Sequence, residues 1–547
     1  MKKKLLLFLT ILLFLFAKAQ NTVGTTFINQ NVFEAYTLIT ANTKSFLINN
    51  CGEVINEWNS NHLPGNAVYL LPNGNLLRAG RTEDGSSNII FGGQGGIIEL
   101  FDWDDNLLWS YTYSTNQFRQ HHDVFPMPNG NVLILAATVI TQAEAFAAGR
   151  DPNLFSQSRL YTEQVLEVEP VGSNQGNIVW EWNVKDHLIQ DFDNTKSNFG
   201  DVALTPGKLD INFLNGGNGG SNWLHFNSIQ YNENLDQIVM SSRNLSEIYI
   251  IDHSTSSSEA ATSSGGNYGN GGDFLYRWGN PQAYKQGTEA DRTLFGQHYP
   301  HYIANGLADA GKLMIFNNGN GRTPEYSEAI IVNPPTTALG VYDYTVNTAF
   351  GPLSVDYSYS DQSSNPSEFY SAIVSSAQRL ANGNTLICEG RVGEIFEIDD
   401  NDNIVWEYKN PVDNVNGSVS SQGDAPPTVP ILFRAIKYAP DFPAFTGRNL
   451  TPGPPIELNP NISACEALSI TDVDIVDLKL YPNPATNFIN ITSSETIDQV
   501  VLYSILGKKV LEVNHTNSID ISAMNSGIYF VKINSGNRTI SKKIVKK

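Results

Sequence analysis

The segment VFPMPNGNVLILA, Val124–Ala136, joins two apolar runs through a Pro-Asn-Gly turn. This pattern is typical of a β-hairpin, because Asn and Gly tolerate the positive φ angles of tight turns. Related hairpins recur as YLLPNGNLLRAGR (Tyr69–Arg81), AQRLANGNTLICEGR (Ala377–Arg391) and, more loosely, LADAGKLMIFNNGNGR (Leu307–Arg322). Recurrence at long, irregular spacing predicts a β-repeat protein and argues against a β-helix.

A second repeated unit ends in tryptophan and alternates with the first. Its copies are GEVINEW to Trp58, DDNLLW to Trp109, GNIVWEW to Trp182 and NDNIVWEY around Trp406, with a weaker copy around Trp278. Each pair of units predicts a four-stranded antiparallel blade, and such blades bury both faces by stacking around an axis. Five or six blades fit between residues 22 and 445, so we expect an all-β chain with a β-propeller there. A β-sandwich is the alternative.

The first nineteen residues predict an export signal rather than part of the fold. MKKK supplies a positive segment, LLLFLTILLFLF an apolar run, and Ala17-Lys18-Ala19 a small-residue cleavage site. The apolar run is shorter than a membrane-spanning helix requires, so no stable membrane span is expected. Residues 1–19 are therefore interpreted as a signal peptide.

The C-terminal part differs from the repeats. A Pro- and Asn-rich stretch lies in an expected linker at residues 446–474, and short alternating strands predict a small β-sandwich at residues 475–547. YPNPA, LYSILGKKV, GIYFVK and the terminal KKIVKK resemble the type A sorting domain of the type IX secretion system. This resemblance implies the type IX machinery as a partner and a secreted or cell-surface location after transit through the periplasm.

Composition narrows the possible partners. The 547 residues carry a formal net charge of −21, and the lysine-rich C-terminus makes the repeat region more acidic still. Such a surface repels the phosphate backbone, so no nucleic-acid partner is expected. The three cysteines, Cys51, Cys388 and Cys465, form no disulfide framework, and a single bridge among them stays open. The Cys and His spacings of structural zinc sites are missing, and no metal is expected.

Histidines precede the turns of several blades at comparable distances. The segments are QHHDVFPMPNG with His121 and His122, WLHFNSIQY with His225, GQHYPHYI with His298 and His301, and HLPGNAVYLLPNG with His62. The first strand of each propeller blade lines the central channel, so residues at one structural address should converge. Imidazole is the side chain most ready to act as base, nucleophile or metal ligand near neutral pH. A histidine site at one mouth of the channel is therefore expected.

These segments resemble those of the bacterial arylsulfate sulfotransferases. The resemblance spans Phe33–Pro411 and rests on TLITANTKSFLINNCGEVINEW, QHHDVFPMPNGN, WLHFNSIQY…IVMSSR, GQHYPHYI…LMIFNNGNGR and NGNTLICEGR…IVWEY. It implies a six-bladed propeller that transfers a sulfuryl group from an aryl sulfate ester to a phenolic acceptor. It also implies that transfer proceeds through a sulfohistidine and needs neither a nucleotide nor another cofactor.

The resemblance also implies residue roles. The implied catalytic residues are His298, His225 and His122, and the implied substrate-binding residues are Asn227, Arg243 and His121. His298, in GQH, matches the histidine that becomes sulfated, and Arg243, in SSR, matches a sulfate-binding arginine. The spacing to the Pro-Asn-Gly turn favours His122 over His121 as the further active-site histidine of HHD.

This chemistry suits the residue types. A neutral imidazole is nucleophilic near pH 7 and leaves easily, so it can divide sulfuryl transfer into two steps. Arg243 offers a permanent charge with fork geometry for the sulfate oxygens, and Asn227 adds a neutral donor. His225 or His122 can protonate the departing phenolate and later deprotonate the acceptor.

Two other classes of function remain open on the sequence. Converging histidines could hold a metal ion with an open position, as in a hydrolase or lyase. A secreted propeller could also bind glycans or proteins at the cell surface without catalysis. A nucleotide-dependent sulfotransferase is not supported, because the GxxxxGK[ST] loop and an alternating strand–helix pattern are both missing.

Overall fold

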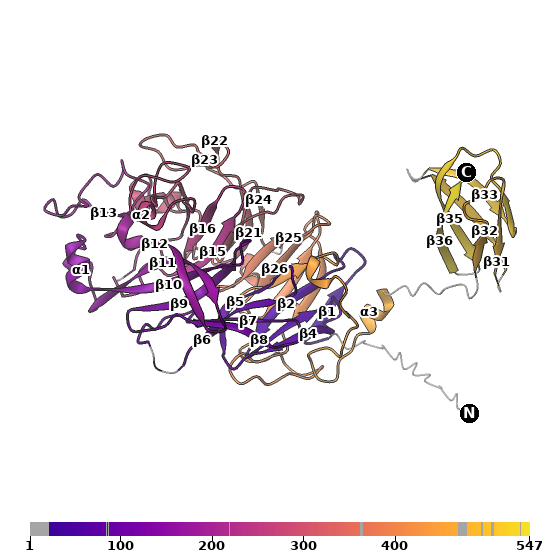
Figure 1. Ribbon diagram of the computed structural model, residues 1–547, viewed down its shortest axis with the longest axis horizontal. Coiled ribbons are helices and arrows are strands. Elements are labelled where there is room, and N and C mark those ends of the chain that lie inside the picture. Colours follow the sequence, from indigo (N-terminus) through magenta and orange to yellow (C-terminus); the bar gives the residue numbers. More distant parts are fainter. Residues whose placement is uncertain are drawn as a thin grey trace, which may run out of the picture. The chain divides into compact units, whose positions relative to one another are not determined.

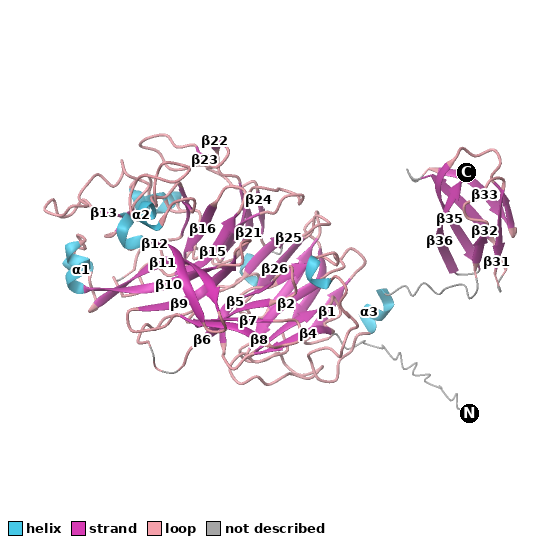
Figure 2. Cartoon of the chain, in the orientation of Figure 1, coloured by secondary structure: helices cyan, strands magenta, loops and turns pink. Residues whose placement is uncertain are grey.

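The computed structural model describes residues 21–468 apart from 84, 86, 218 and 362–364, and residues 478–547 apart from 494–495, 505–507 and 536–537. Contacts divide the chain into two compact units, Met1–Ile462 and Ser463–Lys547. Strands dominate both (Figures 1 and 2), so the all-β prediction is confirmed. The signal-peptide prediction for residues 1–19 lies outside the described residues. None of the described helices is long and apolar enough to cross a membrane.

Six antiparallel sheets of four or five strands make up most of the described part of the first unit. The first comprises β29 (Ile436–Tyr438), β2 (Tyr36–Ala41), β3 (Lys44–Ile48) and β4 (Val54–Asn59), and the second β5 (Pro64–Leu70), β6 (Leu76–Arg81), β7 (Gly96–Phe101) and β8 (Leu107–Thr112). The third comprises β9 (Phe118–Pro126), β10 (Val132–Thr141), β11 (Arg159–Val171) and β12 (Gln175–Asn183). The fourth comprises β15 (Phe226–Asn232), β16 (Gln237–Ser242), β17 (Glu247–Asp252) and β18 (Tyr276–Trp278), and the fifth β19 (His298–Tyr302), β20 (Leu313–Asn317), β21 (Glu328–Val332) and β24 (Tyr357–Tyr359). The sixth comprises β25 (Ser376–Arg379), β26 (Thr385–Glu389), β27 (Glu394–Ile398), β28 (Ile404–Lys409) and β1 (Gly24–Ile28).

Short elements decorate the loops of this unit. They are α1 (Gln142–Ala147), α2 (Ser257–Ala260), the parallel pair β13 (Leu188–Ile189) and β14 (Leu209–Asp210), the pair β22 (Thr336–Ala338) and β23 (Val341–Tyr342), and 3-10 turns at Pro152–Leu154, Val184–His187, Pro281–Tyr284, Glu289–Asp291, Pro366–Glu368 and Pro443–Phe445. Helix α1 begins with a capping box between Thr141 and Glu144, which satisfies amide groups that the first turn leaves unpaired.

The Asn-Gly turns join the first strand to the second in the hairpins quoted above. Gly74, Gly130 and Gly383 have φ of 88°, 89° and 94°, and each donates its amide hydrogen to the carbonyl three residues earlier. Glycine adopts this conformation without a Cβ clash, so the turn sets the register of the hairpin.

The repeated tryptophans connect each sheet to the next. Each is at most 3% exposed, and its indole N–H donates to a backbone carbonyl of the following sheet. The bonds run from Trp58 to Asp102, Trp109 to Gln175, Trp182 to Gly272, Trp278 to Pro352 and Trp406 to Asn50, with lengths of 2.7–2.9 Å. Between the fifth and sixth sheets the Tyr357 hydroxyl donates to Asp402 at 2.5 Å instead. The series therefore leads from the first sheet through the sixth and back to the first.

The apolar core is divided in the same cyclic way. Each neighbouring pair of sheets shares its own cluster of buried side chains in the described part of the unit. Between the sixth and first sheets, for example, Leu386 and Trp406 pack with Ile39 and Phe46. Burial of apolar area between sheets at about 25 cal/mol per Å² is the main favourable term for such an assembly.

Strands from the two ends of the unit complete the first and last sheets. β29, near the end of the unit, pairs with β2, while β1, at its beginning, pairs with β28. Residues 446–462 also belong to this unit, since the Val54 amide donates to the Pro454 carbonyl and the Leu458 amide to Ser420. The domain boundaries at 445 and 474 stay predictions.

A buried ion pair lies where the first strands of several sheets meet. Arg434, just before β29, contacts Asp123 of β9 at 2.9 Å, and both side chains are almost wholly buried. The Tyr69 hydroxyl of β5 donates to Asp123 at 3.3 Å, and Gln230 of β15 donates to Tyr69 at 2.7 Å. The Arg434 guanidinium also lies 3.7 Å from the centroid of the Tyr299 ring of β19.

The second unit contains two antiparallel sheets and one short helix in its described residues. They are α3 (Ser463–Leu468), a sheet of β30 (Lys479–Tyr481), β31 (Phe488–Thr492) and β34 (Ser518–Asp520), and a sheet of β33 (Lys509–Asn514), β32 (Gln499–Ser504), β35 (Gly527–Ser535) and β36 (Arg538–Lys546). Alternating side chains such as Ile489, Val500, Leu502 and Val531 form one buried cluster between them. Of the cysteines, Cys388 is a buried free thiol, and Cys51 and Cys465 are disulfide-bonded.

Candidate functional site

Irregular backbone near the start of the first strands positions the candidate site. His122 in β9, His225 beside β15 and Tyr299 in β19 have φ of 52°, 50° and 51°, and in each strand the pairing register shifts nearby. Positive φ is uncommon for residues other than glycine, and bulges re-aim the side chains next to them. Asn66 of β5 has φ of 93° at a similar register shift. Two of these four irregular residues, His122 and His225, are therefore themselves expected site residues.

The structure brings most of the expected histidines together. The rings of His122 and His225 lie 4.8 Å apart between centroids, and those of His121 and His122 lie 5.1 Å apart. The Phe433 ring lies 6.1 Å from His122 and 6.4 Å from His298, so it connects the two parts of the cluster. These side chains form the histidine cluster, defined as His121, His122, His225 and His298.

The other turn-flanking histidines have different surroundings. His301 stacks on the ring of Tyr299 at 4.4 Å, and its Nδ1 contacts the Tyr299 carbonyl at 3.1 Å. The backbone carbonyl of His62 accepts a hydrogen bond from the Arg78 guanidinium at 2.7 Å. Among the described contacts, neither ring touches the histidine cluster.

His298 is held in one orientation and one tautomer. Its Nδ1 lies 2.7 Å from Oδ1 of Asn318, whose amide nitrogen is itself engaged by the carbonyls of Ser371 and Val374. Since that carbonyl oxygen only accepts, Nδ1 carries the proton and Nε2 keeps its lone pair. Burial, then Arg243, lowers the pKa of His298 to about 3, although Asn318 opposes this shift. His298 is therefore a neutral imidazole with a nucleophilic Nε2 at physiological pH.

His225 has the opposite tautomer. The Asn222 amide nitrogen donates to Nδ1 of His225 at 2.6 Å, so the ring proton lies on Nε2. Burial, then the charge of Arg243, holds the pKa of His225 well below its usual value. His225 can therefore donate a hydrogen bond from Nε2 without carrying a charge.

The two histidines of HHD point in different directions. His121 is fully buried and its Nε2 contacts Glu163 at 2.8 Å, whereas His122 contacts the ring of His225. Their Nδ1 atoms are 2.8 Å apart, so one must donate to the other. Burial, then His225, His121, His298 and Arg243, lowers the pKa of His122 well below its usual value. Of the two rings that the sequence left open, His122 is the one that faces the rest of the cluster.

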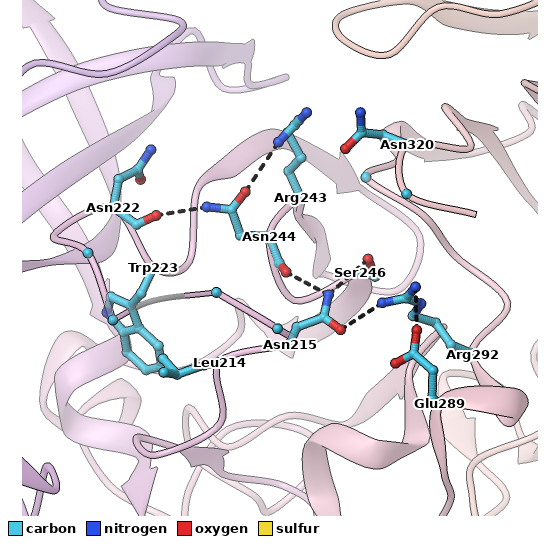
Figure 3. A pocket seen from close by; sticks show the side chains of 16 residues that line it. Leu214, Asn215, Asn222, Trp223, Arg243, Asn244, Ser246, Glu289, Arg292 and Asn320 are labelled. Carbon is cyan, nitrogen blue, oxygen red and sulfur yellow. Dashed lines mark hydrogen bonds and ion pairs between the residues drawn. The ribbon is translucent and has the colours of Figure 1, made fainter. Parts of the chain in front are cut away.

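Arg243 lines an open cavity (Figure 3), and its charge also lowers the pKa values of His225 and His298. Its backbone amide donates to the His225 carbonyl at 3.1 Å, and its guanidinium contacts Asn244 at 3.3 Å and the Ala372 carbonyl at 3.2 Å. Burial lowers its pKa, yet a guanidinium stays protonated at any physiological pH. The cavity measures about 670 Å³ and is lined by Arg243 together with Asn222, Gly296, Asn320 and Arg292. The cavity therefore gives access to Arg243, whereas none of the four clustered histidines is among its lining residues.

Asn227 supports the backbone next to His298. Its amide nitrogen donates to the Gln297 carbonyl at 2.8 Å, and in the described residues its Oδ1 has no hydrogen-bond partner. Gln297 in turn donates to the Ser242 carbonyl at 3.1 Å and to the Glu247 carbonyl at 2.8 Å. Gln297, which precedes His298, is thus held by residues of three strands, β15, β16 and β17.

A glycine-rich loop before β7 covers His122. Phe91 packs edge-on against His121 at 4.9 Å and against His225 at 5.8 Å. The Gly93 carbonyl accepts from the His122 amide at 2.8 Å, and a Cβ on Gly93 would lie 2.0 Å from Nε2 of His122. Gly93 is therefore required by close approach as well as by its φ of 83°.

Sequence reasoning missed several residues of this site. Asn222 directly precedes the quoted WLH segment, and Asn318 belongs to the FNNGNG segment, so their proximity to motifs was a usable signal. Glu163, Phe91 and Phe433 come from segments without any motif. Only the fold brings them next to the histidines.

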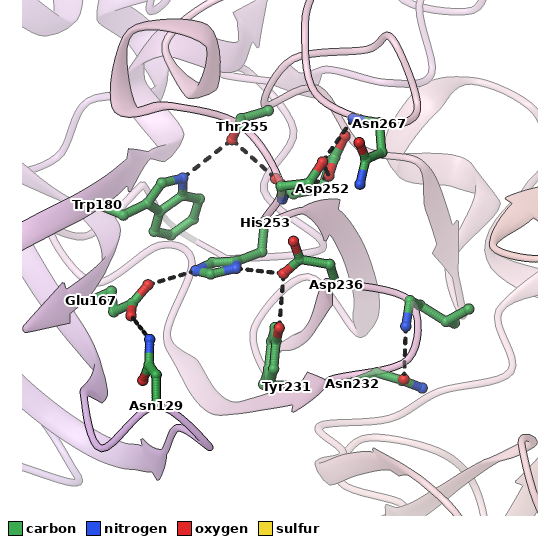
Figure 4. A network of polar contacts seen from close by, with 12 residues as sticks. Asn129, Glu167, Trp180, Tyr231, Asn232, Asp236, Asp252, His253, Thr255 and Asn267 are labelled. Atoms are coloured by element: carbon green, nitrogen blue, oxygen red, sulfur yellow. Dashed lines mark hydrogen bonds and ion pairs between the residues drawn. The ribbon is translucent and has the colours of Figure 1, made fainter.

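A second histidine network contains His253 and Glu167, which lies four residues beyond Glu163 in β11 (Figure 4). His253 contacts Asp236 through Nδ1 at 2.7 Å and Glu167 through Nε2 at 3.0 Å, so it links the third and fourth sheets. Burial alone would lower its pKa, but the bonds to Asp236 and Glu167 raise the pKa of His253 to about 9. Across the described residues, no group of three or more His, Cys, Asp or Glu side chains is placed to hold a metal ion.

Comparison with known families assigns both parts of the chain. Residues 88–419 match the family described as arylsulfotransferase (ASST). The chain belongs to the arylsulfotransferase family. Residues 479–547 match the secretion system C-terminal sorting domain, which indicates type IX secretion to the cell surface or outside the cell. The two resemblances in the sequence are thereby confirmed. No curated protein matches the chain significantly.

Solved structures are only distantly similar. A protein of unknown function from Bacteroides caccae is 11% identical with a TM-score of 0.38, covering 74% of this chain and 98% of its own. The periplasmic gluconolactonase of Pseudomonas aeruginosa is 9% identical with a TM-score of 0.36, covering 74% and 99%. An inactive virginiamycin B lyase from Staphylococcus aureus is 10% identical with a TM-score of 0.31, covering 71% and 88%.

The closeness of Gly93 to His122 leads to a prediction. In Gly93→Ala the new methyl group must displace His122 or the loop, and such misplacement should lower arylsulfotransferase turnover about a hundredfold. Gly130→Ala is the matched control, since its φ is 89° and open space surrounds it. Both variants should lose about 1 kcal/mol of stability from backbone strain. Turnover on p-nitrophenyl sulfate with phenol, measured beside thermal unfolding, separates the two effects; equal turnover in both variants would contradict the steric argument.

The His253 network predicts a pH dependence of stability. Its folded pKa of about 9 exceeds the unfolded value of 6.5, so the stabilisation is full below pH 6.5 and is lost as pH rises through 9. Its size is up to about 3 kcal/mol. Tryptophan fluorescence during denaturant unfolding reports the first unit, which contains all eight tryptophans. His253→Gln should remove this part of the pH dependence, and wild-type and variant curves that stay parallel from pH 6 to 10 would rule it out.

Proposed function

We propose that this protein transfers a sulfuryl group from an aryl sulfate ester to a phenolic acceptor through a sulfohistidine at His298, without a nucleotide donor. The observation that carries this proposal is the hydrogen bond from Nδ1 of His298 to the fixed amide of Asn318. It leaves the Nε2 lone pair on a neutral imidazole whose pKa is lowered in part by Arg243, and Arg243 itself lines an open cavity of about 670 Å³. The family assignment supports the same reaction class.

We also propose the arrangement that holds the site. The six sheets would be the blades of a six-bladed β-propeller, which is supported by the cyclic series of tryptophan and tyrosine hydrogen bonds. The histidine cluster would lie at one mouth of its channel, above the Asp123–Arg434 pair. Residues 1–19 would be a signal peptide and residues 475–547 a β-sandwich that the type IX machinery recognises.

In the first step Nε2 of His298 attacks the sulfur atom, a new N–S bond forms and the bond to the aryl oxygen breaks. Arg243 and the Nε2–H of His225 would bind sulfate oxygens, whose charge shifts during transfer. The departing phenolate takes a proton from the ring of His122. In the second step the acceptor oxygen attacks sulfur, gives its proton to His122 and releases Nε2 of His298.

The sulfated intermediate provides the sharpest test of this proposal. Incubation with p-nitrophenyl sulfate alone should add one sulfuryl group to the peptide that contains His298, detected by mass spectrometry. His298→Asn should abolish the adduct and turnover, because an amide can accept no sulfuryl group. His301→Asn should retain the adduct, because the His301 ring, three residues away, stacks on Tyr299 instead. An adduct that persists in His298→Asn would refute the assignment, and nitrophenol release that phenol does not accelerate would indicate hydrolysis instead.

Arg243 should matter for its shape as well as its charge. Arg243→Lys keeps the charge but loses the fork, so transfer should fall about a hundredfold or more. Arg292→Lys is the matched control, because Arg292 lines the same cavity but its guanidinium is engaged by Asn215 and Glu289. Steady-state kinetics of both variants should therefore differ strongly, and wild-type turnover in Arg243→Lys would show that Arg243 has no role in transfer.

A further inference from the structure

A buried carboxylate connects the two histidine segments of the site. Glu163 of β11 is 1% exposed, and none of the sequence motifs contains it. Its Oε2 contacts Nε2 of His121 at 2.8 Å, while its Oε1 accepts the Phe226 amide hydrogen at 3.0 Å. Phe226 directly follows His225, so one carboxylate holds the histidine pair of β9 and the irregular backbone that presents His225.

The hydrogen bonds continue from Glu163 to the reacting centre. The Glu163 carboxylate accepts a hydrogen bond from the Nε2–H of His121. Neutral His121 therefore has a lone pair on Nδ1, and this lone pair accepts the Nδ1–H of His122. Nε2 of His122 then carries a lone pair and faces Gly93 and the ring of His225. If His121 gains a proton, both Nδ1 roles reverse and Nε2 of His122 becomes a donor. Two proton arrangements therefore fit the same heavy-atom positions.

We propose that Glu163, His121 and His122 form a relay that stores the proton of sulfuryl transfer, with Glu163 as its positioning residue. This inference rests on the proposed function. In the first step Nε2–H of His122 protonates the departing phenolate, while the Nδ1–H of His121 passes to Nδ1 of His122. In the second step Nε2 of His122 takes the proton of the acceptor phenol, and Nδ1–H of His122 returns to His121. One proton leaves and one enters per turnover, so the cycle balances.

The relay solves an electrostatic problem at the site. His122 contacts the ring of His225, and burial, then His225, His121, His298 and Arg243, all disfavour a positive charge on its ring. His121 faces Glu163, His122 and the ring of Phe91, so a charge on His121 lies against a carboxylate. Moving the proton from His122 to His121 therefore transfers the cation away from Arg243 and next to Glu163, where Coulomb attraction favours it.

Glu163→Gln tests the relay. The Gln amide nitrogen would donate to Nε2 of His121, which forces the Nδ1–H onto His121 and locks Nε2 of His122 as a donor. His122 then cannot accept the proton of an acceptor. Turnover with a weakly acidic phenol should fall about a hundredfold, as for loss of a general base. With an acceptor that is already ionised at the assay pH the loss should be less than about tenfold, because no proton must be removed.

The first half-reaction distinguishes failure of the relay from failure of the proposed function. Glu163→Gln should still release one equivalent of nitrophenolate from p-nitrophenyl sulfate and form the adduct on His298, because nitrophenolate leaves without protonation. Wild-type enzyme that forms no adduct would refute the proposed function itself. If the wild-type enzyme forms the adduct but Glu163→Gln lowers turnover equally with all acceptors, the relay is refuted and the proposed function stays intact.

Two further variants keep the test independent of folding. Glu167→Gln is the matched control, because Glu167 is also a buried carboxylate of β11 bound to a histidine, His253, outside the cluster. It should reduce stability while transfer to weakly acidic phenols stays within about twofold of wild type, since it removes no general base. His121→Gln interrupts the relay at its centre and should reproduce the acceptor dependence of Glu163→Gln. The relay would be overturned if the loss of turnover depended on the acidity of the acceptor in Glu167→Gln, or did not depend on it in His121→Gln.

Discussion

The contact between Asp123 and Arg434 is the interaction on which the interior of the first unit depends. Both side chains are buried, and a buried charge is tolerated only when it is paired and hydrogen-bonded. The Ile229 amide, the Tyr69 hydroxyl and the Gln230 amide nitrogen also donate hydrogen bonds to the carboxylate oxygens of Asp123. Removing one partner would leave an uncompensated charge, at a cost of about 3–5 kcal/mol. The pair therefore fixes how closely the first strands can approach one another.

The side chains of the three residues of HHD point in three different directions. His121 faces Glu163 of β11, His122 faces His225, and Asp123 faces Arg434. An ordinary extended strand would alternate its side chains between two faces only. The positive φ of His122 breaks this alternation and makes the third direction available. Strain at this residue is thus coupled to both the reacting centre and the central ion pair.

Much of the architecture could be predicted from the sequence because it depends on local patterns. Asn-Gly turns and alternating apolar residues define hairpins, and the tryptophan repeats mark the last strands. The site residues were harder to predict, because counting positions from a turn is valid only for strands without bulges. Measured from the turn, His122 corresponds to His298, but measured from the residue with positive φ, His298 corresponds to His121. No glycine marks these positions, so the sequence carries no sign of the bulges.

Groups brought in by neighbouring sheets were equally invisible. Glu163 is one of 55 acidic residues, and nothing in its own segment separates it from the solvated ones. Asn318 and Asn222 set the tautomers of His298 and His225, yet they act across turns and between strands. A hydrogen bond that selects one ring nitrogen depends on tertiary contacts, whereas the residue types that perform chemistry can be recognised from motifs.

The pairing of β29 with β2 has a consequence for the growing chain. Ribosomes deliver residues from the N-terminus, so Asp123 is made more than three hundred positions before Arg434, and β2 is made long before β29. Until then the first sheet lacks its first strand, and a carboxylate intended for the interior has no counter-charge. Contacts across such separations form slowly because their chain entropy is lost before the contacts repay it. A half-made chain therefore has neither the Asp123–Arg434 pair nor an assembled histidine cluster, and both form only when this unit is nearly complete.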